Sequence, residues 1–221
     1  MAAPRGRCIR PRGALPEAAS PPPEMASVLA LRREVQLLLS HRQLSRAAGG
    51  LCARYGRDAA WQRCQDLAPA GLLPGRLYLW RAPASAEEAA GLVSTLGVTH
   101  VVNCAQDDCD TAASFPPECA LLTLRARDTA DYDMIGEHLA EVKEFLDAAL
   151  SQRHAVALLH CLHGQNRSAA VGLGYVLLTQ KPGLPELLER ALAIRPSILT
   201  NKAFIEQLVQ LAAQIAGSDG R

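Results

Sequence analysis

The chain has 221 residues, of which 49% are hydrophobic and 20% charged, and its net charge at pH 7 is +1. This length fits one domain of ordinary size with additional sequence, and the composition excludes a chain that is disordered throughout. The charge is uneven: residues 1–70 contain 11 Lys/Arg against 5 Asp/Glu, and residues 71–221 contain 12 against 17. Because nucleic-acid-binding domains normally present a basic face, the acidic larger part argues against non-specific binding to nucleic acid.

The seven cysteines are scattered along the chain without a CxxC pair. Their spacing matches neither a zinc site nor a small disulfide scaffold, so we expect an intracellular protein with reduced cysteines. No apolar run approaches the roughly 18–20 residues of a membrane span, and no signal-peptide core is visible at the start. We therefore expect a cytoplasmic location, with the nucleus as a second one, and no membrane association.

The first third of the chain differs from the rest. Residues 1–24 are rich in Pro, Ala and Arg and predict a disordered tail. Residues 25–70 predict a helical N-terminal extension: apolar side chains follow a 3.6-residue period up to residue 48, and a second short helix is expected at 51–67. Prolines and glycines at 69–75 then mark a boundary.

Strand and helix patterns alternate from this boundary onward. Strands are expected at 77–80, 98–102, 120–124 and 155–159, and helices at 85–96, 135–150, 168–178, 185–194 and 201–215. The alternation predicts an α/β domain over residues 71–216, in which helices flank a central, mostly parallel sheet. Residues 217–221 would form a short tail.

The most informative segment, AVALLHCLHGQNRSAAVGLG, covers residues 155–174. A buried strand is expected to end at His160, a tight loop to run from Cys161 to Arg167, and a helix to begin near Ser168. Such a loop directs backbone N–H groups to one point at a helix N-terminus and forms an anion site. A thiol in this setting has a lowered pKa and becomes a nucleophile, whereas a lone cysteine is otherwise most often an inert buried residue.

The side chains around this cysteine suit a phosphate group. The guanidinium of Arg167 offers paired donors to two phosphate oxygens, and Ser168 can donate to the sulfur when it acts as leaving group. Gly164 supplies the backbone freedom that the loop requires. The candidate substrate-binding residues are those between the cysteine and the arginine, together with the arginine itself: Leu162, His163, Gly164, Gln165, Asn166 and Arg167.

The sequence HCLHGQNRS at 160–168 matches H-C-x5-R-S, the signature of cysteine-based protein phosphatases. Over about residues 71–212 the chain resembles the small atypical dual-specificity phosphatases of the protein tyrosine phosphatase superfamily, with GRLYLW, GVTHVVNCA, RARDTADYDM and RPSILTNKAFIEQL in the expected order. The resemblance implies the cysteine-phosphatase fold and phosphoprotein substrates carrying phosphotyrosine or phosphoserine/phosphothreonine. It further implies a phosphocysteine on Cys161, phosphate binding by Arg167, breakdown assisted by Ser168, and no metal or other cofactor.

The same reaction needs a proton donor for the leaving group and later a base for water. The resemblance places this residue, an aspartate, on a loop about 30–40 residues before the cysteine. Asp128 lies 33 residues before Cys161 and matches this position best. Asp131 and Asp133 are nearby alternatives, and either could instead cap the following helix.

Two features of the loop depart from the dual-specificity pattern and leave other functions open. His163 and Asn166 resemble the cysteine-based RNA 5′-triphosphatases of the mRNA-capping type, although those continue with Thr-Gly where this chain has Ser168-Ala169. RNA triphosphatase activity is therefore the alternative enzyme function. A phosphate-binding interaction module without turnover is the alternative from a different class, but such a module would lack the cysteine or the arginine.

Cys104, in VVNCAQDD, ends a predicted strand. Lipid phosphatases of the tensin type, which resemble this family, carry a redox-active cysteine near this place. By that resemblance Cys104 is a candidate redox partner, which would form a reversible disulfide with Cys161. The alternative is that Cys104 is a small buried hydrophobic residue.

The segment RREVQL, residues 32–37, resembles the docking motif that MAP kinases recognise: a basic pair is followed by alternating apolar residues. A MAP kinase is therefore a candidate partner. An amphipathic helix explains the same residues, because motifs this short recur by chance.

Overall fold

The computed structural model describes residues 23–48 and 68–219. The second helix expected at 51–67 and nearly all of the predicted N-terminal tail lie outside these ranges. The strands are β1 (Ala70–Leu73), β2 (Leu77–Arg81), β3 (His100–Asn103), β4 (Ala120–Thr123) and β5 (Ala157–Cys161). The helices are α1 (Pro23–Ala48), α3 (Ala86–Leu96), the 3₁₀ turn η1 (Ala112–Ser114), α4 (Met134–Ser151), α5 (Arg167–Gln180), α6 (Leu184–Ile194) and α7 (Lys202–Asp219).

The strands form one sheet in the order β1-β2-β5-β3-β4. The pairs β2–β5, β5–β3 and β3–β4 are parallel, and only β1 pairs antiparallel with its neighbour. This arrangement confirms the mostly parallel sheet. The central strand β5 is buried along its whole length, as expected for a strand covered on both faces. Because β5 is the central strand, its carboxyl end lies beside the carboxyl ends of its parallel neighbours β2 and β3, where the loops that follow these strands lie together.

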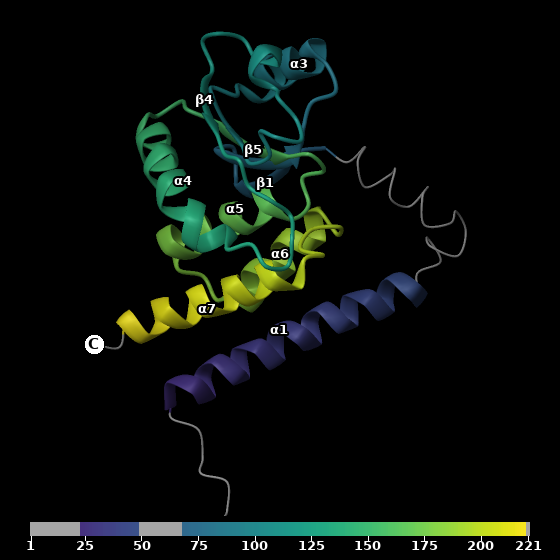
Figure 1. Cartoon of the computed structure of the whole chain (residues 1–221), viewed down its shortest axis with the longest axis vertical. Helices are drawn as coiled ribbons and strands as arrows, with labels where there is room; N and C mark the ends of the chain where they lie inside the picture. Colours follow the sequence, from purple (N-terminus) through teal and green to yellow (C-terminus); the bar gives the residue numbers. More distant parts are fainter. Residues whose placement is uncertain (1–22, 49–67, 220–221) are drawn as a thin grey trace, which may run out of the picture.

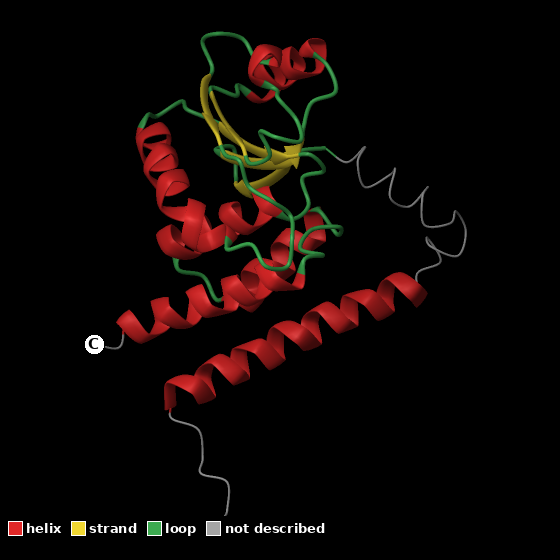
Figure 2. Cartoon of the chain, viewed as in Figure 1, coloured by secondary structure: helices red, strands yellow, loops and turns green. Residues whose placement is uncertain are grey.

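Helices cover both faces of the sheet, with α3 on one side and α4 to α7 on the other (Figures 1 and 2). Successive residues of β5 face opposite sides because side chains alternate along a strand. Leu158 packs in the smaller core with Ala89 and Leu92 of α3, whereas Leu159 packs in the larger core with residues of α4 and α5. The cysteine that ends β5 belongs to the larger core.

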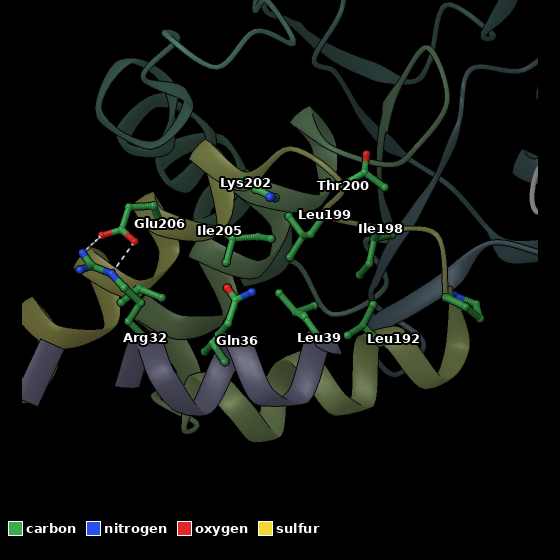
Figure 3. Close-up of a pocket in the computed structure, with 13 residues that line it drawn as sticks. Arg32, Gln36, Leu39, Leu192, Ile198, Leu199, Thr200, Lys202, Ile205 and Glu206 are labelled. Atoms are coloured by element: carbon green, nitrogen blue, oxygen red, sulfur yellow. Dashed lines mark hydrogen bonds and ion pairs between the residues drawn. The ribbon is translucent and has the colours of Figure 1, made fainter. Parts of the chain in front are cut away.

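The N-terminal helix α1 lies along α7 and also contacts α6 (Figure 1). Val35 is 2% exposed and belongs to the larger core. The guanidinium of Arg32 forms a bidentate ion pair with the carboxylate of Glu206 in α7. A cavity of about 290 Å³ separates part of α1 from the loop between α6 and α7, where Leu199 and Thr200 line it (Figure 3). The structure thus contains a helix over residues 25–48, where the sequence predicts one.

The observed elements differ from the sequence predictions mainly at their ends. β1 is not predicted at all, because four residues of an antiparallel edge strand give too short a pattern. β3 begins two residues later than expected, and α7 continues to Asp219, so residues 217–219 of the predicted tail are helical. Within the described residues, no helix combines the length and apolar character needed to cross a membrane.

Candidate active site

The loop of residues 162–166, which we call the cysteine loop, connects the end of β5 to the start of α5. Cys161 is 2% exposed at the end of the strand. Gly164 adopts a φ of +61°, and a Cβ at this position would lie 2.2 Å from the carbonyl oxygen of Trp80. Only glycine fits both the conformation and this close approach, so Gly164 allows the loop to turn tightly against β2.

Three successive carbonyl groups of the cysteine loop bond outward to the loop between α6 and α7. Arg195, which is 1% exposed, donates from Nε to the carbonyl of Gly164 at 3.0 Å and from Nη2 to that of His163 at 3.2 Å. The backbone N–H of Leu199 donates to the carbonyl of Gln165 at 2.9 Å. Because these carbonyls bond outward, N–H groups of the loop remain available to an anion on the inner side.

The environment of Cys161 lowers its pKa. Burial alone raises the pKa of the thiol, but hydrogen bonds and charge outweigh burial. The Ser168 hydroxyl donates to Sγ at 3.3 Å, the backbone N–H groups of Ser168 and Gln165 act in the same direction, and the guanidinium of Arg167 adds a positive charge. The sulfur is thereby stabilised as a thiolate, the form in which cysteine acts as a nucleophile.

Arg167 is the first residue of α5 and is 4% exposed. Its Nη1 donates to the carboxylate of Asp108 and, at 3.0 Å, to the carbonyl of Ala126. Within the described part of the chain its buried Nε has no hydrogen-bond partner. The guanidinium is thus held in place on one side, and a donor remains for an oxyanion at the cysteine loop.

Asp128 lies on the loop between β4 and α4, and the structure brings it to the cysteine loop. Its carboxylate accepts from Nδ2 of Asn166 at 3.1 Å and from Nδ2 of Asn201 at 3.0 Å. The two alternatives differ in position: Asp133 caps α4 by accepting from the N–H of Gly136 at 2.9 Å, and Asp131 pairs with Thr129. Of the three aspartates, Asp128 is the one bonded to the cysteine loop.

The other predicted loop residues occupy different environments. Leu162 is 37% exposed and His163 is exposed, so both lie at the rim, whereas Gln165 is buried at 6% exposed. His160 is fully buried behind the cysteine, with Nε2 at 3.0 Å from Oγ1 of Thr111. Burial lowers the pKa of His160 to about 4, so the ring is neutral at physiological pH.

Cys104 lies just beyond the end of β3 and near Cys161, whose charge acts on it. Asn103 pairs with His160 in the β3–β5 register, and the N–H of Cys104 donates to the His160 carbonyl at 2.8 Å. Cys104 directly follows the last residue of β3, Cys161 is the last residue of β5, and both are free thiols. Burial, followed by the neighbouring charge of Cys161, holds the pKa of Cys104 well above its usual value.

Sequence reasoning missed the residues that brace the site. Asp108, Arg195, Thr200 and Asn201 are distant in sequence from Cys161, and none carries a local pattern that assigns it a role. The only signal available was the segment RPSILTNKAFIEQL, which contains three of them.

The described residues also bear on metal binding. Residues 23–48 and 68–219 contain no group of three or more His, Cys, Asp or Glu side chains suited to hold an ion.

A buried, activated cysteine in a loop between a central strand and a helix, followed by a braced arginine, defines the site class of the cysteine-dependent phosphatases. Residues 77–214 match the family model of the dual specificity phosphatase catalytic domain. The chain therefore belongs to the dual specificity phosphatase family.

Known proteins from two distantly related organisms are similar in sequence to this chain. Dual specificity protein phosphatase 13B of Homo sapiens is 32% identical over 130 residues, which are 57% of this chain and 65% of that protein. MAP kinase phosphatase with leucine-rich repeats protein 3 of Dictyostelium discoideum is 26% identical over 148 residues, 66% of this chain and 16% of that protein. The match thus spans less than two thirds of the length of each of these two relatives.

The fold is also found among solved structures. The crystal structure of a mouse putative dual specificity phosphatase, complexed with zinc tungstate, has a TM-score of 0.58 and 25% sequence identity, and the match covers 68% of this chain and 90% of that one. Such neighbours confirm the cysteine-phosphatase fold predicted from the sequence.

Proposed function

We propose that this protein hydrolyses phosphotyrosine and phosphoserine/phosphothreonine in proteins through a phosphocysteine intermediate. The observation that carries the proposal is the environment of Cys161: its sulfur accepts from Ser168 in a loop whose carbonyls are bonded outward, and its pKa is lowered. A thiolate at the foot of an anion-binding loop is suited to in-line attack on a bound phosphoryl group.

The proposed reaction has two steps. In the first, the thiolate of Cys161 attacks phosphorus, the bond to the leaving oxygen breaks, and Asp128 gives that oxygen its proton. In the second, Asp128 accepts a proton from water, the water attacks phosphorus, and Ser168 donates to the departing sulfur. The loop N–H groups and Arg167 hold the phosphoryl oxygens throughout.

A similar protein was solved in complex with an oxyanion. The mouse putative dual specificity phosphatase was solved with zinc tungstate, and tungstate is a tetrahedral oxyanion like phosphate. We propose that the cysteine loop of the present chain binds a tetrahedral oxyanion of this kind. Nε of Arg167 supports this proposal, because it is a buried donor directly after the cysteine loop and has no hydrogen-bond partner among the described residues.

Phosphate release from three substrates tests the proposed function. Wild type and Cys161→Ser would be compared on an aryl phosphate, a doubly phosphorylated Thr/Tyr peptide and a 5′-triphosphate RNA. Release from the first two substrates, abolished in the variant, is the expected result. Release from the RNA alone would replace the proposal by RNA triphosphatase activity. Binding of phosphopeptide without any release would indicate an interaction module.

Asn166, one of the two residues that favoured the RNA alternative, has hydrogen-bond partners within this protein. The amide of Asn166 bonds to Asp128 and to residues 200–201 of the same chain. The side chain is occupied within the protein, so its presence supports no RNA-specific contact. We therefore favour phosphoproteins, and we propose a MAP kinase among them because one relative is named as a MAP kinase phosphatase.

A further inference from the structure

Helix α1 precedes residues 77–214, which match the family model, but it packs on elements next to the active site. It contacts α6 and α7, the two helices that flank the loop of residues 195–201. Val35 of α1 is buried in the larger core, and Arg32 forms its bidentate ion pair with Glu206 of α7. The helix is therefore attached through both an apolar contact and a charged contact.

Leu199, in the loop of residues 195–201, has an unfavourable backbone conformation. Its φ is +57°, in the left-handed region where the Cβ of a residue other than glycine is crowded. A bulky residue keeps such a conformation only when its surroundings enforce it. Two kinds of contact oppose the strain here. The N–H of Leu199 donates to the carbonyl of Gln165 at 2.9 Å, and the Leu199 side chain is buried in the larger core.

The side chain of Leu199 faces the side of the loop that α1 covers. It lines the cavity between the loop and α1 together with Val35, Gln36 and Leu39 of that helix. Figure 3 shows Gln36 and Leu39 pointing toward this loop. Leu199 is only 3% exposed, and α1 contributes to its burial. Without α1 the strained conformation would be less favoured, because water would reach apolar side chains that are now covered.

We propose that α1 is an intramolecular activator of the phosphatase, and that its packing holds the loop of residues 195–201 and the cysteine loop in their active conformation. The inference rests on the proposed function, because it assigns a regulation to the same site. Leu199 is the link, since its side chain faces α1 and its N–H bonds to the cysteine loop. Release of α1 lets Leu199 leave the left-handed region and loosens the residues that bind phosphate. Any partner that captures α1 therefore lowers the activity, because it favours the released state.

Val35→Asp tests this coupling in the full-length chain. Burying a carboxylate among apolar side chains is costly, so the substitution is expected to release α1. Leu37→Asp is the matched control, because it introduces the same charge on the same helix at a position that is 53% exposed. Hydrogen–deuterium exchange would be followed in residues 23–48, 162–166 and 195–201, and kcat/KM would be measured on an aryl phosphate.

The two variants have different expected results. Val35→Asp should accelerate exchange in all three segments and lower kcat/KM by at least about fivefold, because misplaced groups at a site cost up to about 10²-fold. Leu37→Asp should leave exchange and kcat/KM at their wild-type values. Release of α1 with unchanged kcat/KM, or with unchanged exchange in residues 195–201, would overturn the proposal, and so would equal losses in both variants. Absence of phosphate release by wild type would instead contradict the proposed function, and the exchange rates would still test the coupling.

A charge exchange covers the case in which Val35→Asp unfolds the domain, which a loss of protection in the buried strand β5 would reveal. Arg32→Glu places a like charge beside Glu206, so it should loosen α1, accelerate exchange in residues 195–201 and lower kcat/KM. Arg32→Glu/Glu206→Arg restores a pair of opposite charges and should recover both measurements. Wild-type exchange and kcat/KM in Arg32→Glu, or no recovery in the double variant, would contradict the proposal.

Discussion

The reactivity of Cys161 depends on its neighbours, since burial by itself would favour the neutral thiol. Ser168, the N–H groups of the cysteine loop and Arg167 reverse that tendency. His160 contributes differently: it is a buried neutral ring that bonds to Thr111 and stacks on Phe115. Adjacent residues of one strand thus have opposite electrostatic tasks, one stabilised as an anion and the other kept uncharged.

The depressed pKa of His160 predicts a pH-dependent stability. The folded protein protonates this ring near pH 4 and the unfolded chain near 6.5, so the unfolded chain binds more protons between these values. The contribution is complete above 6.5 and is lost as the pH falls toward 4. Between about pH 7.5 and about pH 5 it amounts to about 2 kcal/mol of unfolding free energy.

Urea unfolding at these two pH values, on wild type and His160→Gln, measures this contribution. Glutamine retains an amide that can reach Thr111 but does not titrate. The variant is expected to lose about 2 kcal/mol less than wild type on acidification. An equal loss in both proteins would show that His160 does not carry the effect.

The position of Cys104 beside Cys161 predicts protection against oxidation. Peroxide would oxidise the Cys161 thiolate to a sulfenic acid, and the Cys104 sulfur would then form a disulfide with it as water leaves. Wild type treated with peroxide should recover most of its phosphatase activity with dithiothreitol, whereas Cys104→Ser should be inactivated irreversibly as the sulfinic acid forms. Cys109→Ser is the matched control, because Cys109 is also influenced by the Cys161 charge. Equal recovery in Cys104→Ser and wild type would contradict the pairing.

At the scale of elements, the loop between α6 and α7 is the main support of the site. Arg195 and Leu199 bond the carbonyls of the cysteine loop, and Thr200 and Asn201 bond Asn166 and Asp128. The other side of the same loop faces α1 across the cavity in Figure 3. The site is therefore built from β5 and α5 but held by a segment about 30 residues further along the chain.

Helix α1 carries the segment that resembles a kinase docking motif, and its packing divides that segment. Arg32 is paired with Glu206 and Val35 is buried, whereas Arg33 and Leu37 are exposed. If a MAP kinase binds here, Arg33→Ala should weaken co-precipitation of the kinase several-fold, and Arg32→Ala/Arg33→Ala should abolish it. Glu34→Ala, at an exposed position on the same helix, is the control. Unchanged co-precipitation with Arg33→Ala would rule out docking through this segment.

At the scale of the whole molecule, much of the fold could be predicted because its elements are separated by clear breaks. The apolar run at 155–159 and the helix that follows Arg167 predict the centre of the site, since strand, loop and helix are contiguous there. The order of the strands could not be predicted, because it depends on contacts between distant segments. β1 was missed for a different reason: four residues of an edge strand carry little periodic signal.

The same distinction applies to the site. Cys161, Arg167 and Ser168 lie within one short segment, and Asp128 could be proposed because a resemblance supplied its spacing. Arg195 and Asn201 act through hydrogen bonds that exist only once α6 and α7 have packed. Asp108 belongs to an acidic run whose sequence does not reveal which carboxylate reaches Arg167. Local sequence thus predicts the reacting groups, whereas tertiary packing determines what holds them.

Trapping the covalent intermediate tests whether Cys161 is the nucleophile. Asp128→Ala would be mixed with an aryl phosphate that has a good leaving group, quenched within the first turnovers, and analysed by peptide mass spectrometry. Because this variant lacks the base for the second step, we expect a phosphoryl group on Cys161 that is absent from Cys161→Ser. Phosphate release without any phosphoryl group on Cys161, or with the group on another residue, would contradict it.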